Sequence, residues 1–245
     1  MTQSSNPQDR TFSGVAPIGF DAQSIPIYEV CTTQVKVSQE LLDPSSLRSR
    51  FQNPPVWQPE ITDENRQVIA ADIIAKRQAA GKITQAAVLI PLLLNQDGLS
   101  VLLTQRTDHL HDHAGQISFP GGRMDPVDLS PHDTALRESQ EEIGLDPNAV
   151  EIIGNLPQYL TVSGYSVTPV VGLVKPQAEY ALDAFEVADV FEVPLHFLMD
   201  PANHQVRVWE SDQGSRRFYS MPYENRFIWG ATAGMLRNLY HLLKV

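Results

Sequence analysis

The chain has 245 residues, 42% of them hydrophobic, which is long enough to bury the core of one large domain or of a smaller domain with an extension. Its formal net charge of −11, with no run of lysine or arginine, disfavours a nucleic-acid-binding protein. No apolar run reaches the length of a membrane span, and the first ten residues lack the pattern of a secretory signal. With a single cysteine, Cys31, and therefore no internal disulfide, we expect a cytoplasmic protein without nucleic-acid or membrane partners.

The first 60 residues have the composition of an irregular extension, because they contain seven of the 18 prolines and many glutamines and serines. One strand is expected within them, at residues 27–37. Apolar side chains at residues 20–30 indicate packing against another surface, which leaves a homodimer open. Apolar residues then recur at helical spacing near residues 63–80. We therefore divide the chain into an N-terminal extension, residues 1–80, and a main domain, residues 81–245.

The main domain opens with two apolar runs, residues 86–94 and 99–104, joined by an Asp97-Gly98 turn, which together predict a β-hairpin. Further strands are expected at residues 116–119, 150–153, 167–174, 187–193, 207–209 and 217–219, the last two flanking a turn at 211–214. Helices are expected at residues 131–143 and near 230–243. Strands interleaved with helices predict an α/β fold with a mixed sheet.

The helix expected at residues 131–143 has local signals at both ends. Ser130 can act as its N-cap, and Pro131 suits the first helical position. Gly144 suits the position that follows the C-terminus. These signals fix both boundaries without reference to the rest of the chain.

An acidic cluster occupies the last turns of this helix. Glu138, Glu141 and Glu142 stand at i, i+3 and i+4, so they share one face, where both mutual repulsion and the helix dipole are unfavourable. A divalent cation would reverse that repulsion, and hard carboxylate oxygens suit Mg²⁺ or Mn²⁺. A solvated acidic helix end is the alternative. The upstream Gly121-Gly122 pair, where the backbone can approach a ligand closely, favours the metal site.

The glycine pair and the helix together resemble the Nudix box, which reads Gly, five residues, Glu, seven residues, then Arg-Glu-apolar-x-Glu-Glu-x-Gly-apolar. Residues 137–145 match the second half, with Ser139 where an apolar residue is usual. The first half departs more, because Asp128 stands at the glutamate position and eight residues precede Arg137. The resemblance implies a Nudix fold, a mixed β-sheet sandwiched between helices, and a metal-dependent hydrolase of diphosphate linkages in small molecules.

Residues 102–122 resemble the signature of the coenzyme A diphosphatase branch, roughly Leu-Leu-Thr-x-Arg-Ser, a spacer, then Leu-Arg-x-His-x-Gly-Gln-apolar-x-Phe-Pro-Gly-Gly. Thr107 replaces the serine and keeps the hydroxyl, whereas His111 replaces an arginine. Three later segments are also similar to that branch: 164–172, 186–195 and 227–230. The resemblance implies cleavage of coenzyme A or its derivatives to 3′,5′-ADP and 4′-phosphopantetheine or acyl-phosphopantetheine.

The resemblance also assigns roles to individual side chains. Glu138, Glu141 and Glu142 are expected to bind the metal, and Glu141 and Glu142 to take part in catalysis with it. Arg137 is expected to aim these carboxylates as a structural partner within the catalytic group. Glu186, supplied by a distant loop, is the candidate for a further metal ligand or general base, with an exposed loop acid as the alternative.

Phosphate groups of the substrate need cationic partners. The candidates nearest in the sequence are Arg106 and Arg123, beside the backbone of Gly121 and Gly122. Three histidines could add charge when they are protonated: His109, His111 and His113.

Two other functions stay open at this stage. The first is a Nudix diphosphatase for ADP-ribose, NADH or another nucleoside diphosphate derivative, because the box alone does not separate these substrates and His111 weakens the coenzyme A signature. The second is a non-catalytic, nucleotide-sensing Nudix-like protein. The extra residue near Asp128 favours the sensor, and the intact helix glutamates oppose it.

Overall fold

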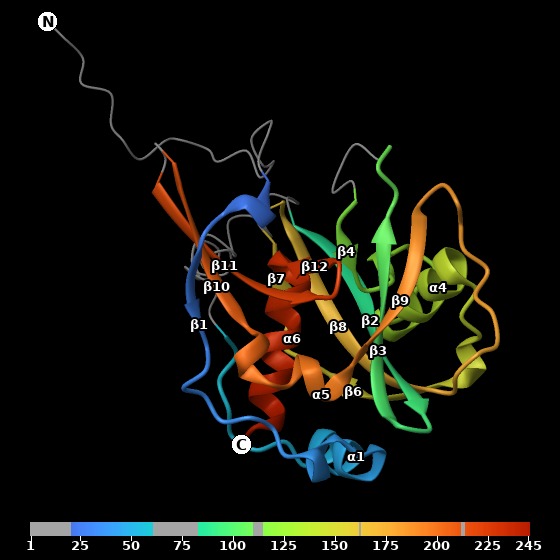
Figure 1. Cartoon of the computed structure of the whole chain (residues 1–245). Helices are drawn as coiled ribbons and strands as arrows, with labels where there is room; N and C mark the ends of the chain where they lie inside the picture. Colours follow the sequence, from blue (N-terminus) through green and yellow to red (C-terminus); the bar gives the residue numbers. More distant parts are fainter. Residues whose placement is uncertain (1–20, 61–82, 110–114, 162, 212–213) are drawn as a thin grey trace, which may run out of the picture.

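Two β-sheets and the helices packed on them make up the described part of the chain (Figure 1). The computed structural model describes residues 21–60, 83–109, 115–161, 163–211 and 214–245. The helix predicted near residues 63–80 lies outside them. None of the described helices is long and apolar enough to cross a membrane.

The larger sheet has eight strands and is mixed, as predicted. Its strands are β2 (Thr84–Asn95), β3 (Gly98–Arg106), β4 (Ile117–Ser118), β5 (Gly121–Arg123), β6 (Val150–Asn155), β7 (Tyr159–Leu160), β8 (Tyr165–Val174) and β9 (Val187–Pro194). The central order is β4-β3-β2-β8-β6, with β5 beside β2, β7 beside β8 and β9 beside β3. Strands β2 and β8 are parallel, and the other pairs are antiparallel. The predicted β2–β3 hairpin is confirmed.

Helices cover both faces of this sheet. They are α1 (Pro44–Gln52), α4 (Pro131–Ile143), α5 (Leu195–Leu198) and α6 (Gly230–Leu243), with short 3-10 helices at Ala22–Ser24, Gln39–Leu42, Pro147–Ala149 and Pro201–Asn203. Because side chains alternate along a strand, Ile90 and Leu92 enter the core shared with α6. Leu89 and Leu93 enter the core shared with α4. The α-β-α sandwich is therefore confirmed.

A second, four-stranded antiparallel sheet lies on the far side of α6 from the larger sheet (Figure 1). Its strands, in spatial order, are β1 (Ile27–Val30), β10 (Gln205–Ser211), β11 (Gly214–Tyr223) and β12 (Arg226–Trp229). The strand predicted at residues 27–37 is too long. The chain turns after Val30, where the N–H of Thr32 donates to the Val30 carbonyl, and the N–H of Cys31 donates to His204.

The N-terminal segment that the structure describes is packed onto the rest of the chain. Val37, Leu42 and Leu47 are buried in the same core as α6. The Arg237 guanidinium on α6, which is 1% exposed, binds the Glu60 carboxylate at 2.8 Å. The division of the chain near residue 80 and the homodimer stay predictions.

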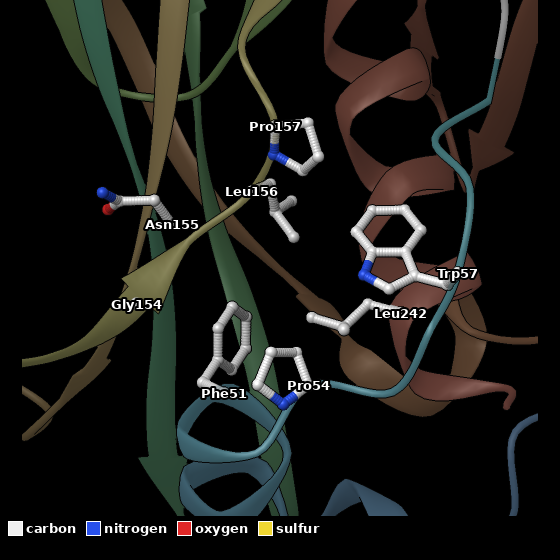
Figure 2. A pocket seen from close by; sticks show the side chains of 8 residues that line it. All are labelled: Phe51, Pro54, Trp57, Gly154, Asn155, Leu156, Pro157 and Leu242. Carbon is white, nitrogen blue, oxygen red and sulfur yellow. The ribbon is translucent and has the colours of Figure 1, made fainter.

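A pocket of about 360 Å³ remains between this segment and the body of the protein. Figure 2 shows the side chains that line it: Phe51, Pro54, Trp57, Gly154, Asn155, Leu156, Pro157 and Leu242. None of the predicted site residues is among them, so this pocket is separate from the acidic cluster.

Helix α4 has the bounds predicted from its local signals. The N–H of Asp133 donates to the Ser130 hydroxyl at 3.3 Å, and Gly144 adopts the left-handed conformation, with φ of 66°. Ser139, at a position where the family pattern has an apolar residue, is fully buried. Its hydroxyl donates to the Ala135 carbonyl at 2.6 Å, which satisfies its polarity within the helix.

We expect Gly144→Ala to destabilise the fold more than Gly230→Ala. Both glycines have left-handed φ angles, 66° and 63°, so both substitutions carry a backbone strain of about 1–2 kcal/mol. A methyl group at Gly144 would also lie 2.9 Å from the side chain of Ala181, whereas nothing lies within 4 Å at Gly230. Urea denaturation of both variants measures the difference, and equal losses would contradict the close packing at Gly144.

Candidate active site

The three predicted glutamates lie where the C-terminal half of α4 packs against β5. Glu142 is 6% exposed, and its Oε2 accepts a hydrogen bond from the Gly121 N–H at 3.2 Å. The Glu138 side chain is 18% exposed, and that of Glu141 is 60% exposed. The helix therefore presents one carboxylate in the interior, one at the boundary and one in solvent.

The two glycines of β5 allow the close approach between strand and helix. A Cβ atom at Gly122 would lie 2.6 Å from the carboxyl carbon of Glu138. A Cβ atom at Gly121 would lie 2.4 Å from the carbonyl oxygen of Ala87 on β2. A side chain at Gly121 would collide with the backbone of β2, and one at Gly122 would displace the Glu138 carboxylate.

Arg137 binds several oxygens around the acidic face. Its Nε and Nη2 donate to the two Asp128 oxygens at 3.0 and 2.9 Å, a bidentate pair. Its Nη1 lies 2.9 Å from Glu138 and 3.1 Å from Glu141, and its Nη2 donates to the Arg123 carbonyl. Arg137 thus links the loop before α4 to two of the three glutamates.

Asp128, whose position differs from the family pattern by one residue, is fully engaged in hydrogen bonds. Besides Arg137, its carboxylate accepts from the Thr134 hydroxyl and the Asp125 N–H, both at 2.9 Å. Its side chain is 3% exposed. The hydrogen bonds from Arg137 are the main cause that lowers the pKa of Asp128. Asp128 therefore acts as an anchor for Arg137, and the extra residue before the helix is accommodated in the loop.

The charge of Glu186 acts on Glu142, although Glu186 stands 44 positions further along the sequence. Burial raises the pKa of Glu142 to about 8, and the like charges of Glu138 and Glu186 add to that increase. Burial also raises the pKa of Glu138, to which Glu186 again contributes. The charges of Glu138 and Glu186 therefore oppose the ionisation of Glu142.

The connection between β8 and β9, which carries Glu186, is held against the end of α4. The N–H of Asp183 donates to the Glu142 carbonyl at 2.9 Å. The buried Thr107 hydroxyl donates to the Phe185 carbonyl at 2.8 Å, and the Thr107 N–H donates to the Glu186 carbonyl at 3.0 Å. We did not expect this role of Thr107 from the sequence, where the retained hydroxyl in the family signature was the only indication.

The predicted cationic residues lie in different environments. Arg106, at the end of β3, lowers the pKa of Glu142, which places its charge near that carboxylate. Its Nε is buried and has no hydrogen-bond partner among the described residues. The Arg123 side chain is exposed. The His109 ring contacts Phe185, whereas His111 and His113 lie outside the described residues.

The donor set fits a divalent cation that shares its coordination with a substrate. Within the described ranges, no three His, Cys, Asp or Glu side chains converge closely enough to hold an ion by themselves. The Nη1 atom of Arg137 bridges the Glu138 and Glu141 carboxylates, whereas the Glu142 carboxylate is bound separately by the Gly121 N–H. Mg²⁺ is usually bound by one or two carboxylates together with water and substrate phosphates, so a closed protein cage is not required. The repulsion among Glu138, Glu142 and Glu186 is the kind that such a cation relieves.

A family model and the curated relatives that match this chain both name the Nudix family. The family model described as NUDIX domain matches residues 83–213. The protein named "Uncharacterized Nudix hydrolase NudL" from Escherichia coli (strain K12) is 46% identical over 157 residues, which cover 63% of this chain and 80% of that protein. The protein of the same name from Shigella boydii serotype 18 has the same identity and coverage.

Among solved structures, a Nudix hydrolase from M. smegmatis, RenU, aligns with a TM-score of 0.40 and 21% identity over 46% of this chain and 71% of that one. A binary complex of an Ap4A hydrolase from C. elegans aligns with a TM-score of 0.40 and 19% identity over 47% of this chain and 85% of that one.

We expect Glu142→Gln to stabilise the metal-free protein at alkaline pH. Folding raises the pKa of the Glu142 carboxyl from 4.5 to about 8. The protonated carboxyl therefore favours the folded state, and this contribution to stability is lost as the carboxyl ionises. The native chain should therefore lose stability as pH rises from about 5 to 8, by about 3 kcal/mol, and the variant should lose less. Urea denaturation in EDTA at pH 5 and pH 9 measures this difference.

Glu141→Gln is the control, because that side chain is 60% exposed and its charge is largely solvated. Equal pH dependence in the native chain and both variants would show that the buried Glu142 charge does not destabilise the fold.

Proposed function

The chain belongs to the Nudix hydrolase family, and we propose that it hydrolyses the diphosphate linkage of coenzyme A or of its acyl derivatives. The products are 3′,5′-ADP and 4′-phosphopantetheine or acyl-phosphopantetheine. The observation that carries the hydrolytic assignment is the buried Glu142 carboxylate, which the Gly121 N–H binds and on which the charges of Glu138, Glu186 and Arg106 all act. Such a site pairs carboxylates for a metal with a cation for a phosphate.

Coenzyme A is favoured among diphosphate substrates by the segment that leads into the site. Residues 102–122 resemble the coenzyme A diphosphatase signature. The surroundings of two residues in this segment, Arg106 and Thr107, suit the proposed function. Arg106 has a buried Nε free of hydrogen-bond partners among the described residues, as a phosphate-binding guanidinium requires. Thr107 holds the loop that carries Glu186.

In this proposal, Glu138, Glu141 and Glu142 hold Mg²⁺ or Mn²⁺. The cation, when bound, neutralises phosphate oxygens and lowers the pKa of a bound water. Arg137 fixes the Glu138 and Glu141 carboxylates, and the Gly121 N–H fixes that of Glu142.

The remaining side chains act on the substrate and on the water. The Arg106 guanidinium donates to a phosphate oxygen and balances the charge that develops on the leaving phosphate. The Glu186 carboxylate accepts the proton of the attacking water. Its loop is held by two hydrogen bonds that Thr107 donates, from its hydroxyl to the Phe185 carbonyl and from its N–H to the Glu186 carbonyl.

The substrate class is tested by incubating the purified chain and Mg²⁺ or Mn²⁺ with coenzyme A, ADP-ribose or NADH, and separating the products by chromatography. We expect 3′,5′-ADP to form from coenzyme A with the highest kcat/KM of the three. Preferential turnover of ADP-ribose or NADH would reassign the substrate within the family. Nucleotide binding without turnover of any substrate would instead indicate a sensor.

We expect Glu142→Gln to lower kcat by about 100-fold or more while the folded structure is kept, because the neutral amide retains an acceptor for Gly121 but loses the metal-binding charge. Glu151→Gln is the matched control, since Glu151 pairs with Arg48 at the surface of β6. Circular dichroism verifies folding of both variants. Unchanged turnover by Glu142→Gln would remove this carboxylate from the mechanism.

A further inference from the structure

An exposed aromatic ring stands next to the candidate general base. Phe185 immediately precedes Glu186, and its side chain is 64% exposed. Exposure of a phenyl ring is unfavourable in water, because apolar surface gains about 25 cal/mol per Å² when it is buried. A ring kept at this position by the fold is therefore available to a ligand that covers it.

The backbone of Phe185 is fixed on both sides. Its N–H donates to the Asp183 carboxylate at 2.8 Å, and its carbonyl accepts from the Thr107 hydroxyl at 2.8 Å. The next residue is held as well, by the bond from the Thr107 N–H to the Glu186 carbonyl. These bonds fix the backbone that carries the ring and leave the ring exposed, so little backbone conformational entropy is lost when a ligand binds to it.

His109 supports the ring from one side. The two ring centroids are 4.9 Å apart, and their planes are tilted by 59°. This pair connects the segment after β3 with the segment before β9, the two chain segments that also supply Arg106 and Glu186. Because His109 already contacts Phe185, a planar ligand would stack on the part of the phenyl ring that is still exposed.

We infer that Phe185, backed by His109, is the stacking platform for the purine base of a nucleoside diphosphate substrate. The inference rests on the proposed function, in which a diphosphate lies between the helix carboxylates and Arg106. Phe185 and Glu186 are consecutive residues, whose Cα atoms are about 3.8 Å apart, and one ribose separates a base from its diphosphate, so the ring lies within reach of a base whose diphosphate is bound beside Glu186. Stacking on a phenyl ring suits a purine because its aromatic face needs no hydrogen-bond partner.

A second strongly exposed aromatic side chain, Tyr28, is placed less suitably for this role. Tyr28 is 68% exposed but lies on β1, in the second sheet and on the opposite side of the molecule from α4 (Figure 1). Its ring is already covered in part by the Arg217 guanidinium at 5.6 Å. Phe185, in contrast, directly precedes Glu186, whose charge raises the pKa values of Glu138 and Glu142.

The test measures equilibrium binding of two probes, 5′-ADP and inorganic diphosphate, in the presence of Mg²⁺ and without any turnover. Phe185→Leu keeps an apolar side chain but removes the aromatic face. We expect it to weaken 5′-ADP binding roughly tenfold and to leave inorganic diphosphate binding unchanged. Phe185→Trp should restore 5′-ADP affinity.

The Phe185→Trp variant also gives a spectroscopic readout, measured against the native chain with its three tryptophans. Its additional fluorescence should be quenched by 5′-ADP and not by inorganic diphosphate. Equal 5′-ADP affinity in the native chain and Phe185→Leu, or the absence of 5′-ADP binding to the native chain, would overturn the platform. An equal loss for both probes would also overturn it, because that result indicates a displaced loop.

The outcome is independent of the coenzyme A assay. Coenzyme A turnover with unchanged 5′-ADP affinity in Phe185→Leu would leave the proposed function standing and remove the platform. Selective loss of 5′-ADP binding in a chain that does not cleave coenzyme A would support the platform and reassign the substrate to another nucleoside diphosphate derivative.

Discussion

The buried carboxylate of Glu142 is the constraint around which the site is organised. It accepts one hydrogen bond, from the Gly121 N–H, and has Glu138 and Glu186 as neighbours of the same charge. A buried charge without full compensation is strongly unfavourable, so burial raises the pKa of Glu142 to about 8, and the metal-free fold loses stability once this carboxyl ionises. In the proposed function, a divalent cation would offset that cost by pairing with the ionised carboxylate.

Two arginines near these carboxylates illustrate the difference between a structural and a substrate-directed cation. Arg137 is saturated, since Asp128, Glu138, Glu141 and a backbone carbonyl surround it. Arg106 affects the same acidic group but keeps a buried Nε without a partner among the described residues. A saturated guanidinium fixes geometry, whereas an unsaturated one retains donors for a phosphate. The distribution of hydrogen bonds, rather than the charge, separates their roles.

The connection between β8 and β9 joins the metal-facing end of α4 to the proposed base platform. Asp183 binds the carbonyl of Glu142, and two residues later Phe185 is bound by Thr107. Glu186 follows directly. A displacement of this loop would therefore move Phe185, the proposed general base Glu186 and the packing at the helix end together, so the hydrogen bonds from Thr107 hold all three in place.

The sequence by itself determined the features that depend on near neighbours in the chain. Ser130 and Gly144 set the ends of α4, and helical spacing put Glu138 and Glu142 on one face, because capping and periodicity act within a few residues. Only the tertiary structure decided how distant segments meet. The separate sheet formed by β1 and β10–β12 and the approach of Glu186 to Glu142 depend on packing between segments far apart in the sequence. The pairing of Asp128 with Arg137 spans nine residues, but it depends on the path of the loop before α4, which holds the extra residue. No local periodicity or cap encodes such contacts, so they become visible only when the whole core is assembled.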